Sequence, residues 1–269
     1  MYTEKPNNIE FKEHINLVAK EARTHINRII GLATMLSDKD DNEVTHELLL
    51  SSYRLLTQNM NMMYIHMEEL ISDTAIINAE AILTGIIGEC TTVIETAIKD
   101  ALEHEMEIDT EYLPESVGCK LQFVVKNKKS SVKIDEKAFT LAVMNLLQNA
   151  LMYSPPNTTV IVKLDTIFMS DDERYVCVSV KNLNGLKKCD PGLGLTLCKR
   201  IAERCGGMFE CIHERGCITA KIMLPLQNEE PGVGLSSEFV EYFSDRYKPV
   251  KLFMYEVVER IKRNVKLED

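Results

Sequence analysis

The chain has 269 residues, of which 45% are hydrophobic and 27% charged, and its formal net charge is −10 at pH 7. The composition is that of a soluble globular protein, and the negative charge argues against a nucleic-acid-binding surface, which needs a basic stripe to displace counterions. Apolar stretches are broken short of the roughly 18 residues that cross a membrane, no secretory leader opens the chain, and the eight cysteines lack zinc spacing, so we expect a cytoplasmic protein with reduced thiols.

Two long helices are predicted at the start of the chain. Apolar residues recur every three or four positions from about residue 10 to 36, and after a polar turn at 37–42 a second such run extends from residue 44 to about 71. Each helix of about 27 residues would be roughly 40 Å long. A lone hairpin would leave this apolar stripe exposed, so we predict a homodimer in which residues 10–71 of two chains form a four-helix bundle.

A domain of mixed composition is predicted after a short connection at residues 73–81. The periodicity favours helices at 82–102, 138–152 and 195–205. Short β-rich runs predict strands at 107–109, 121–125, 131–134, 160–164, 176–180, 209–212 and 218–224. Helices mixed with antiparallel strands indicate an α+β sandwich.

The tail is polar and has its own pattern. Residues 227–235 contain Pro231 and two glycines, which indicates a linker, and two helix-like stretches follow at 236–245 and 250–266. We therefore divide the chain into a helical hairpin at 1–75, a mixed domain at 76–226 and a linker with C-terminal helices at 227–269. The sequence leaves open whether the last helices pack on the mixed domain or extend the dimer.

Two motifs in the mixed domain point to chemistry. Asn145 and Asn149 are four residues apart and share one face of a predicted helix whose other face is apolar. Gly192 and Gly194 precede a later helix, where glycines let backbone N–H groups approach phosphate oxygens at the positive helix end. Each motif alone is a weak signal of function, and the occurrence of both in this order is a stronger signal.

Together the motifs resemble the N box and the second glycine box of the histidine kinase catalytic domain, whose fold is shared with ATPases of the chaperone and gyrase type. The resemblance extends over residues 10–226. It implies the cytoplasmic core of a two-component sensor histidine kinase, in which a dimerising hairpin precedes an α/β sandwich. It further implies ATP and Mg²⁺ as cofactors and a response-regulator receiver domain as partner.

The resemblance implies roles for single residues. Asn149 matches the asparagine that ligates Mg²⁺ between the phosphates, and an amide oxygen suits this hard cation. Asn145 matches the asparagine that supports the same site. Tyr153 stands where the family often has an aromatic residue against the adenine, and Gly192 and Gly194 match the glycines under a mobile lid.

The nucleotide motifs also depart from the family pattern. Asn182 takes the place of the aspartate that accepts a hydrogen bond from the adenine amino group, and an amide oxygen accepts without charge assistance. The lid is short. Lys187 and Lys188 lie in it and either meet the phosphate charge or are solvated. Met152 stands where the family often has a basic residue.

The largest departure lies in the hairpin. Residues 19–31 resemble the family's phosphoacceptor segment, in which Glu21 and Thr24 match, but the accepting histidine is replaced by Lys20. A lysine with a pKa near 10.4 is almost wholly protonated at neutral pH and is a poor nucleophile. His25 occupies the family's proline position, about 140° around the helix from residue 20.

Three hypotheses follow. In the first, a degenerate dimeric histidine kinase homologue binds Mg-ATP and acts through conformation or partner docking. In the second, the protein is an active histidine kinase that uses His25 or phosphorylates a histidine on another chain. In the third, the ATP fold is vestigial, and a receiver domain docks near Lys20, Glu21 and Thr24 for scaffolding, phosphotransfer or dephosphorylation.

Overall fold

The chain forms two compact units, Met1–His66 and Met67–Asp269, which are described separately. The computed structural model describes residues 44–45, 48, 50–55, 57, 61, 74–105, 120–126, 129–170, 173–183, 192–229 and 249–265. In the first unit, the described positions between 44 and 61 are helical, as the sequence predicts. The predicted helix at 10–36 lies outside the described residues.

A five-stranded sheet is the frame of the second unit. All five of its strands were predicted, each somewhat shorter than it is, and they lie in the order β2-β4-β5-β7-β6. Their bounds are β2 Lys120–Val125, β4 Thr159–Phe168, β5 Arg174–Leu183, β6 Met208–Glu214 and β7 Cys217–Pro225.

The sheet is mixed in direction. Strand β2 pairs with β4 in parallel, whereas the remaining neighbours pair antiparallel. The sequence predicted antiparallel strands, and β2 is the exception to that direction. Its reason is the connection: the chain returns from β2 to β4 through β3 and the long helix α4 (Glu136–Tyr153), and such a crossover joins parallel strands.

A second, two-stranded sheet joins β1 (Ala75–Asn78) to β3 (Ser131–Ile134). The sequence predicted β3 but only a connection at β1, because the Ala-Ile-Ile-Asn sequence of β1 lacks the apolar and polar alternation that Ser-Val-Lys-Ile shows in β3. Asn78 also starts the next helix, since its Oδ1 accepts from the backbone N–H of Ala81 at 3.2 Å and from Ser130 Oγ at 2.8 Å. A short strand thus places the beginning of α3 (Ala79–Glu105).

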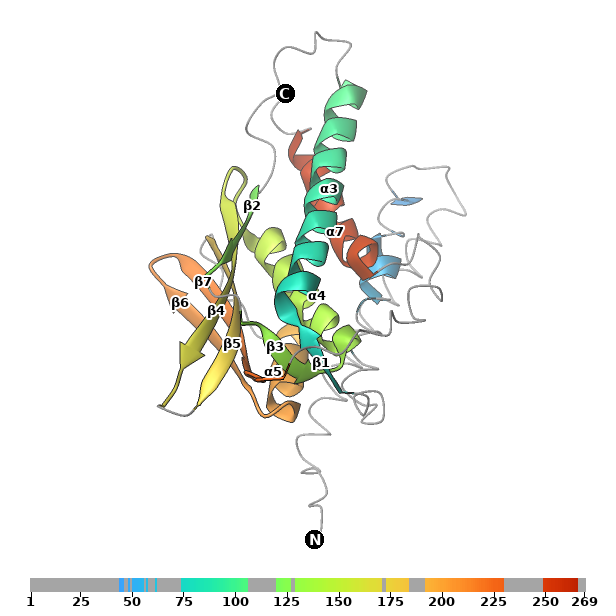
Figure 1. The fold of residues 1–269 in the computed structure, drawn as a ribbon. Helices are drawn as coiled ribbons and strands as arrows, with labels where there is room; N and C mark the ends of the chain where they lie inside the picture. Colours follow the sequence, from blue (N-terminus) through green and yellow to red (C-terminus); the bar gives the residue numbers. More distant parts are fainter. Residues whose placement is uncertain are drawn as a thin grey trace. The chain divides into compact units, whose positions relative to one another are not determined.

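Helices α3, α4 and α5 (Leu193–Arg204) form a layer against one face of the large sheet (Figure 1). Helix α4 is the most enclosed. It begins at Asp135, whose carboxylate accepts from the N–H of Ala138 at 2.7 Å, and it ends before Ser154, whose hydroxyl donates to the Ala150 carbonyl at 2.6 Å. The predicted α+β sandwich is confirmed for this unit.

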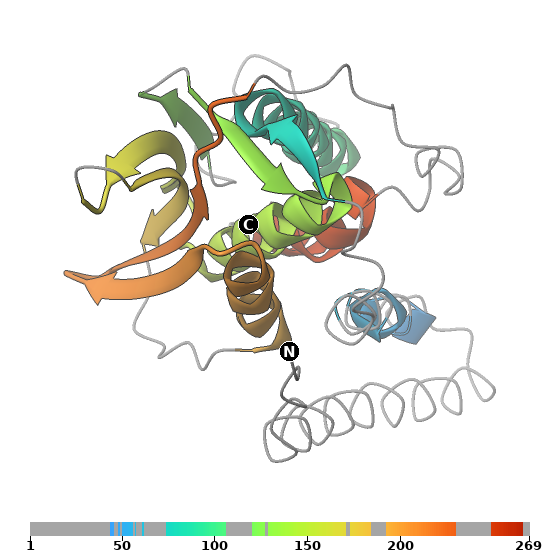
Figure 2. The same cartoon turned by 60° about the horizontal axis from the view of Figure 1, so that its bottom comes forward.

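The C-terminal helix α7 (Pro249–Val265) belongs to the same unit and packs on α3 and α4. It lies on the side of these helices that faces away from the large sheet (Figures 1 and 2). Its buried residues recur every three or four positions and include Val250, Phe253, Val257 and Ile261. The sequence predicted this helix but not where it packs. The other predicted tail helix and the predicted strand at 107–109 lie outside the described residues.

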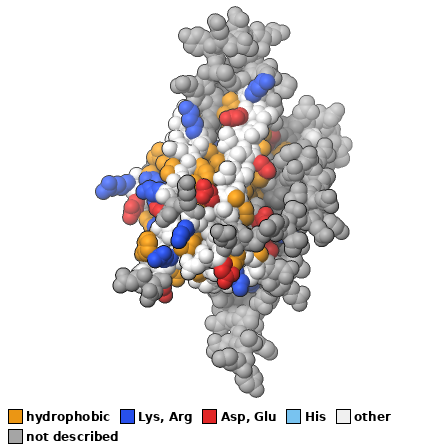
Figure 3. Space-filling view, viewed as in Figure 1, with side chains coloured by type: hydrophobic (Ala, Val, Ile, Leu, Met, Phe, Trp, Pro, Cys, Tyr) orange, Lys and Arg blue, Asp and Glu red, His pale blue; other side chains and the backbone are white. Residues whose placement is uncertain are grey.

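Helix α3 matches a membrane-spanning helix by length and composition over Ala79–Lys99, where its mean hydropathy is 1.4. Its buried side chains, among them Leu83, Cys90 and Ile94, contribute to the core of the second unit. A core helix of this kind meets the same criterion. Figure 3 shows acidic and basic side chains scattered among apolar ones, with no continuous basic stripe among the described residues on that face.

Candidate functional site

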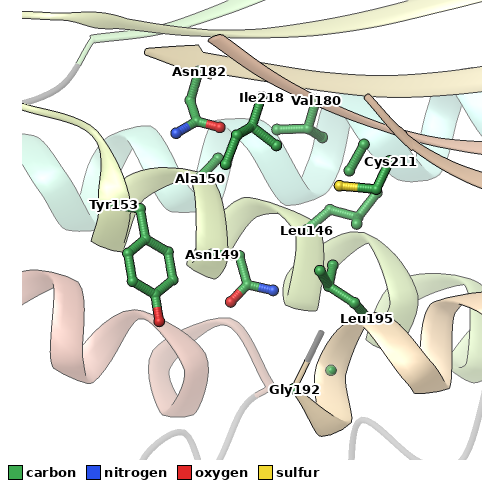
Figure 4. Close-up of a pocket in the computed structure, with 12 residues that line it drawn as sticks. Leu146, Asn149, Ala150, Tyr153, Val180, Asn182, Gly192, Leu195, Cys211 and Ile218 are labelled. Atoms are coloured by element: carbon green, nitrogen blue, oxygen red, sulfur yellow. The ribbon is translucent and has the colours of Figure 1, made fainter. Parts of the chain in front are cut away.

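A pocket of about 110 Å³ lies between α4, the large sheet and the start of α5 (Figure 4). Its walls come from segments that are far apart in the sequence. The lining residues are Leu146, Asn149, Ala150, Tyr153, Val180, Asn182, Gly192, Gly194, Leu195, Cys211, Ile218 and Ala220. Five of the residues singled out in the sequence are therefore neighbours in space.

Asn149 is a polar group of α4 that lines this pocket and is half-buried there. Figure 4 shows it and Tyr153 projecting from the same side of the helix, one turn apart. Within the described part of the chain, no group forms a hydrogen bond with the Asn149 amide. None of these residues competes with a ligand for the oxygen and nitrogen of this amide.

Asn145 has a different environment, although it lies only one helical turn before Asn149. It is 3% exposed and is not among the pocket-lining residues, and its Nδ2 donates to the Leu141 carbonyl at 2.8 Å. A Cβ atom on Gly194 would lie well within 3.0 Å of Asn145 Oδ1. Asn145 thus packs α4 against α5, and Gly194 is the residue that permits this close approach.

Asn182 faces the pocket from the sheet side, near the end of β5 (Figure 4). It is 4% exposed, and its Nδ2 donates to the carbonyl of Leu183 at 2.9 Å. Because the nitrogen is engaged in this way, Oδ1 is the atom left to accept a hydrogen bond from a ligand. The position can therefore recognise a donor such as an amino group.

The beginning of α5 forms one end of the pocket. Gly192 is the N-terminal capping residue, and its carbonyl accepts from the N–H of Thr196 at 3.2 Å. The backbone N–H groups that precede Thr196 in the first turn have no partner within the helix, and they lie at its positive end. This end of the pocket is suited to an anionic group such as phosphate.

An aromatic ring and an apolar floor complete the pocket. Tyr153, the last residue of α4, is 46% exposed and lines the opening. The large sheet contributes three buried apolar residues to the pocket lining, namely Val180, Ile218 and Ala220. A flat ring system would find apolar contact on the sheet and an aromatic side chain beside it.

Cys211 is a pocket residue that sequence reasoning missed. The only signal for it is register: Cys211 stands opposite Ala220 on the neighbouring strand, and both line the pocket. The six cysteines among the described residues are free thiols, as expected. Burial raises the pKa of the Cys198 thiol far above its usual range, so this cysteine stays protonated and acts as a packing residue of α5.

The structure thus brings together Asn149, Tyr153, Asn182, Gly192 and Gly194, with Asn145 behind them. Among the described residues no group of three or more His, Cys, Asp or Glu side chains could hold a metal ion. A single amide oxygen is nevertheless a donor that suits Mg²⁺, which keeps several waters and takes further ligands from phosphates. The remaining candidate residues, Lys20, Glu21, Thr24, His25, Lys187 and Lys188, lie outside the described part of the chain.

Solved structures similar to this chain include histidine kinases. The histidine kinase AdeS of Acinetobacter baumannii superposes with a TM-score of 0.54 at 15% identity, over 77% of this chain and 97% of that chain. Histidine kinase ThkA, in its complex with the response regulator protein TrrA, gives a TM-score of 0.55 at 18% identity, over 80% of this chain and 61% of that chain. No family model matches the sequence, and no curated protein does. The likeness therefore establishes the histidine kinase fold.

Proposed function

We propose that this protein is a histidine-kinase-like signalling protein that binds Mg-ATP in the described pocket and lacks ordinary autophosphorylation. One observation carries the proposal. An amide without a protein partner among the described residues, an amide acceptor and a helix N-terminus surround a single pocket with an apolar floor, and they come from Asn149, Asn182 and Gly192 respectively.

Each part of an adenine nucleotide has a counterpart in this arrangement. The adenine ring would lie on the apolar floor beside Tyr153, and its amino group would donate to Asn182 Oδ1. The phosphates would approach the N-terminus of α5. Because Asn182 is neutral, this hydrogen bond is weaker than one to a carboxylate, and we expect a modest affinity.

The Mg²⁺ ion would be held by the Asn149 amide oxygen together with phosphate oxygens and water. When bound, it supplies positive charge that balances the charge of the phosphates. Asn145 contributes to this site by fixing α4 against α5 and does not reach the ion itself.

The proposal that ordinary autophosphorylation is lacking rests on Lys20, which stands where the family has its phosphoacceptor histidine. Incubation with γ-labelled ATP should leave the protein without an acid-labile label. A label that disappears in His25→Ala would instead establish an active kinase with a displaced acceptor. We further propose a cytoplasmic homodimer that pairs through residues 10–71.

Calorimetric titration with Mg-ATP tests the central proposal. Wild type should bind, Asn149→Ala should lose roughly tenfold or more in affinity through the lost ligand, and EDTA should weaken wild-type binding. Asn157→Gly is a matched control: this asparagine is exposed, lies outside the pocket and has a φ of 61°, which glycine adopts freely. If wild type does not bind Mg-ATP, the proposal that this pocket is a nucleotide site is refuted.

Docking of a receiver domain is a second candidate function. It is favoured by the fold shared with ThkA, which forms a complex with a response regulator. In this chain the candidate surface surrounds Lys20, Glu21 and Thr24. A pull-down with a receiver domain should succeed with wild type and fail with Glu21→Lys, and equal capture by both would place the contact elsewhere.

A further inference from the structure

The C-terminal helix α7 forms hydrogen bonds with the C-terminal end of α4, the helix that carries Asn149. Arg260 of α7 donates from Nη1 to the Leu151 carbonyl at 2.7 Å and from Nη2 to the Ser154 carbonyl at 2.6 Å. Nη1 also donates to the carbonyl of Met152. One guanidinium therefore binds three carbonyls at the end of α4, from a position more than 100 residues later.

These carbonyls lie at the C-terminal end of α4, where hydrogen-bond donors from outside the helix are needed. The last carbonyls of a helix have no partner within it, and they carry the negative end of the helix dipole. Helix α4 has no basic residue in its own last turn. Arg260 supplies the missing positive charge from another element, and its planar fork can reach several acceptors at once.

Further contacts keep α7 in place along α4. Gln148 Nε2 donates to Glu256 Oε2 at 3.0 Å, and Glu256 lies one helical turn before Arg260. Phe253 and Met254 are 0% exposed, so the helix also buries an apolar face. Figure 2 shows α7 alongside α4 in this unit.

The turn of α4 that Arg260 contacts is also the turn at the pocket opening. Tyr153 lies between Met152 and Ser154, whose carbonyls both bind Arg260, and it lines the pocket. Asn149 lies one turn earlier. Gln148, which contacts α7, is about 140° around the helix from Tyr153. Helix α4 therefore presents one side to the pocket and another to α7.

We infer that Arg260 is a positioning residue for the nucleotide pocket, so that docking of α7 and binding of Mg-ATP favour each other. This inference rests on the proposed function. Docked α7 fixes the last turn of α4, and with it Asn149 and Tyr153. By linkage, a nucleotide that prefers the fixed turn must strengthen α7 docking by the same factor. Any event that withdraws α7 then weakens nucleotide binding.

The test uses the full chain and two readouts, calorimetry with Mg-ATP and hydrogen exchange of the α7 amides with and without Mg-ATP. The variants are Arg260→Met, which removes the charge, and Arg260→Lys, which keeps it without the fork. Arg204→Met is the matched control, because Arg204 is exposed and stands in the last turn of α5, far along that helix from the pocket glycines. Gln148→Ala removes the second polar contact and serves if Arg260→Met does not fold.

We expect Arg260→Met to weaken Mg-ATP binding by roughly tenfold, Arg260→Lys to lie between it and wild type, and Arg204→Met to bind within about twofold of wild type. Mg-ATP should slow exchange in α7 of wild type and have no such effect in Arg260→Met; Gln148→Ala should show a smaller loss in both measurements. Arg260 or Gln148 variants that bind like wild type, or an α7 whose exchange ignores the nucleotide, would overturn the inference while the proposed function stands. A wild type that binds no Mg-ATP would overturn both.

Discussion

Replacing Gly194 with alanine tests how the pocket helices fit together. The added Cβ would lie well within 3.0 Å of Asn145 Oδ1 and 3.2 Å from Asn145 Cγ. Asn145 is 3% exposed, and its Nδ2 is bound to the Leu141 carbonyl. The amide therefore has no room to swing aside, so either this hydrogen bond or the contact between α4 and α5 must yield.

The expected cost follows from two opposing effects. Overpacking a well-filled site costs about 1–3 kcal/mol, and replacing a glycine inside a helix with alanine returns about 0.5–1 kcal/mol. At mid-range values, Gly194→Ala should therefore lower the free energy of unfolding by about 1 kcal/mol, and the loss should not exceed about 2.5 kcal/mol. Gly192→Ala is the control: its Cβ would meet no described atom within 4 Å and its φ is −74°, so the change introduces no clash and should cost only about 0.5 kcal/mol, through the preference of the N-cap for glycine over alanine.

Urea unfolding of the second unit, followed by circular dichroism, measures these differences. If the clash with Asn145 is the cause, the pair Asn145→Ala and Gly194→Ala should be coupled, and the double variant should lose less than the sum of the single losses by about 1 kcal/mol. Equal stability of Gly194→Ala and Gly192→Ala, or strict additivity in the double variant, would refute the packing role of Asn145.

The other predictions concern the pocket, an ion pair and a helix cap. Mg-ATP should slow alkylation of Cys211, which lines the pocket, and leave the similarly half-buried Cys217 unchanged, whereas equal rates with and without nucleotide would contradict the site. The hydrogen bond from Lys163 holds the pKa of Asp165 below its ordinary value of 3.8, so the contribution of this pair to stability is present above that pH and is lost as the pH falls through the lower folded value. Asp165→Asn should thus cost less than about 1 kcal/mol at neutral pH, because the pair is partly exposed, and urea titrations should show this cost shrinking as the pH falls below 3.8; a constant cost would refute the linkage. Asp135→Ala removes the N-terminal cap of α4 and should lower the free energy of unfolding by about 1 kcal/mol; an unchanged urea midpoint would contradict that role.

The spacing of apolar residues predicted most helices and strands of the second unit, because this spacing is set within each element. The helix expected at 138–152 is α4 with one or two residues added at each end, and the strands extend beyond their β-branched centres. Strand β1 was missed because its Ala-Ile-Ile-Asn sequence does not alternate as the equally short β3 does, and the parallel direction of β2 depends on a crossover rather than on its own residues.

The pocket was predictable in part for a similar reason. The motifs identified Asn149 and the α5 glycines through their spacing, but the contacts that separate the roles of neighbouring residues are tertiary. Arg260 binds carbonyls more than 100 residues away and has no local signature. Cys211 reaches the pocket only through the register between β6 and β7.

The two asparagines of α4 show how one motif can carry two kinds of constraint. At four residues apart they differ by only about 40° in direction, and the packing of α5 against this face decides which one is enclosed. Asn145 has its hydrogen bond and its glycine neighbour, so its amide is satisfied by the fold alone. Asn149 has no hydrogen-bond partner within the described residues, and it lines a pocket whose other walls are mainly apolar. A half-buried amide in such surroundings lowers stability unless water or a ligand completes it. Packing therefore explains the asparagine at 145, whereas packing among the described residues leaves the amide of Asn149 to water or a ligand in the pocket.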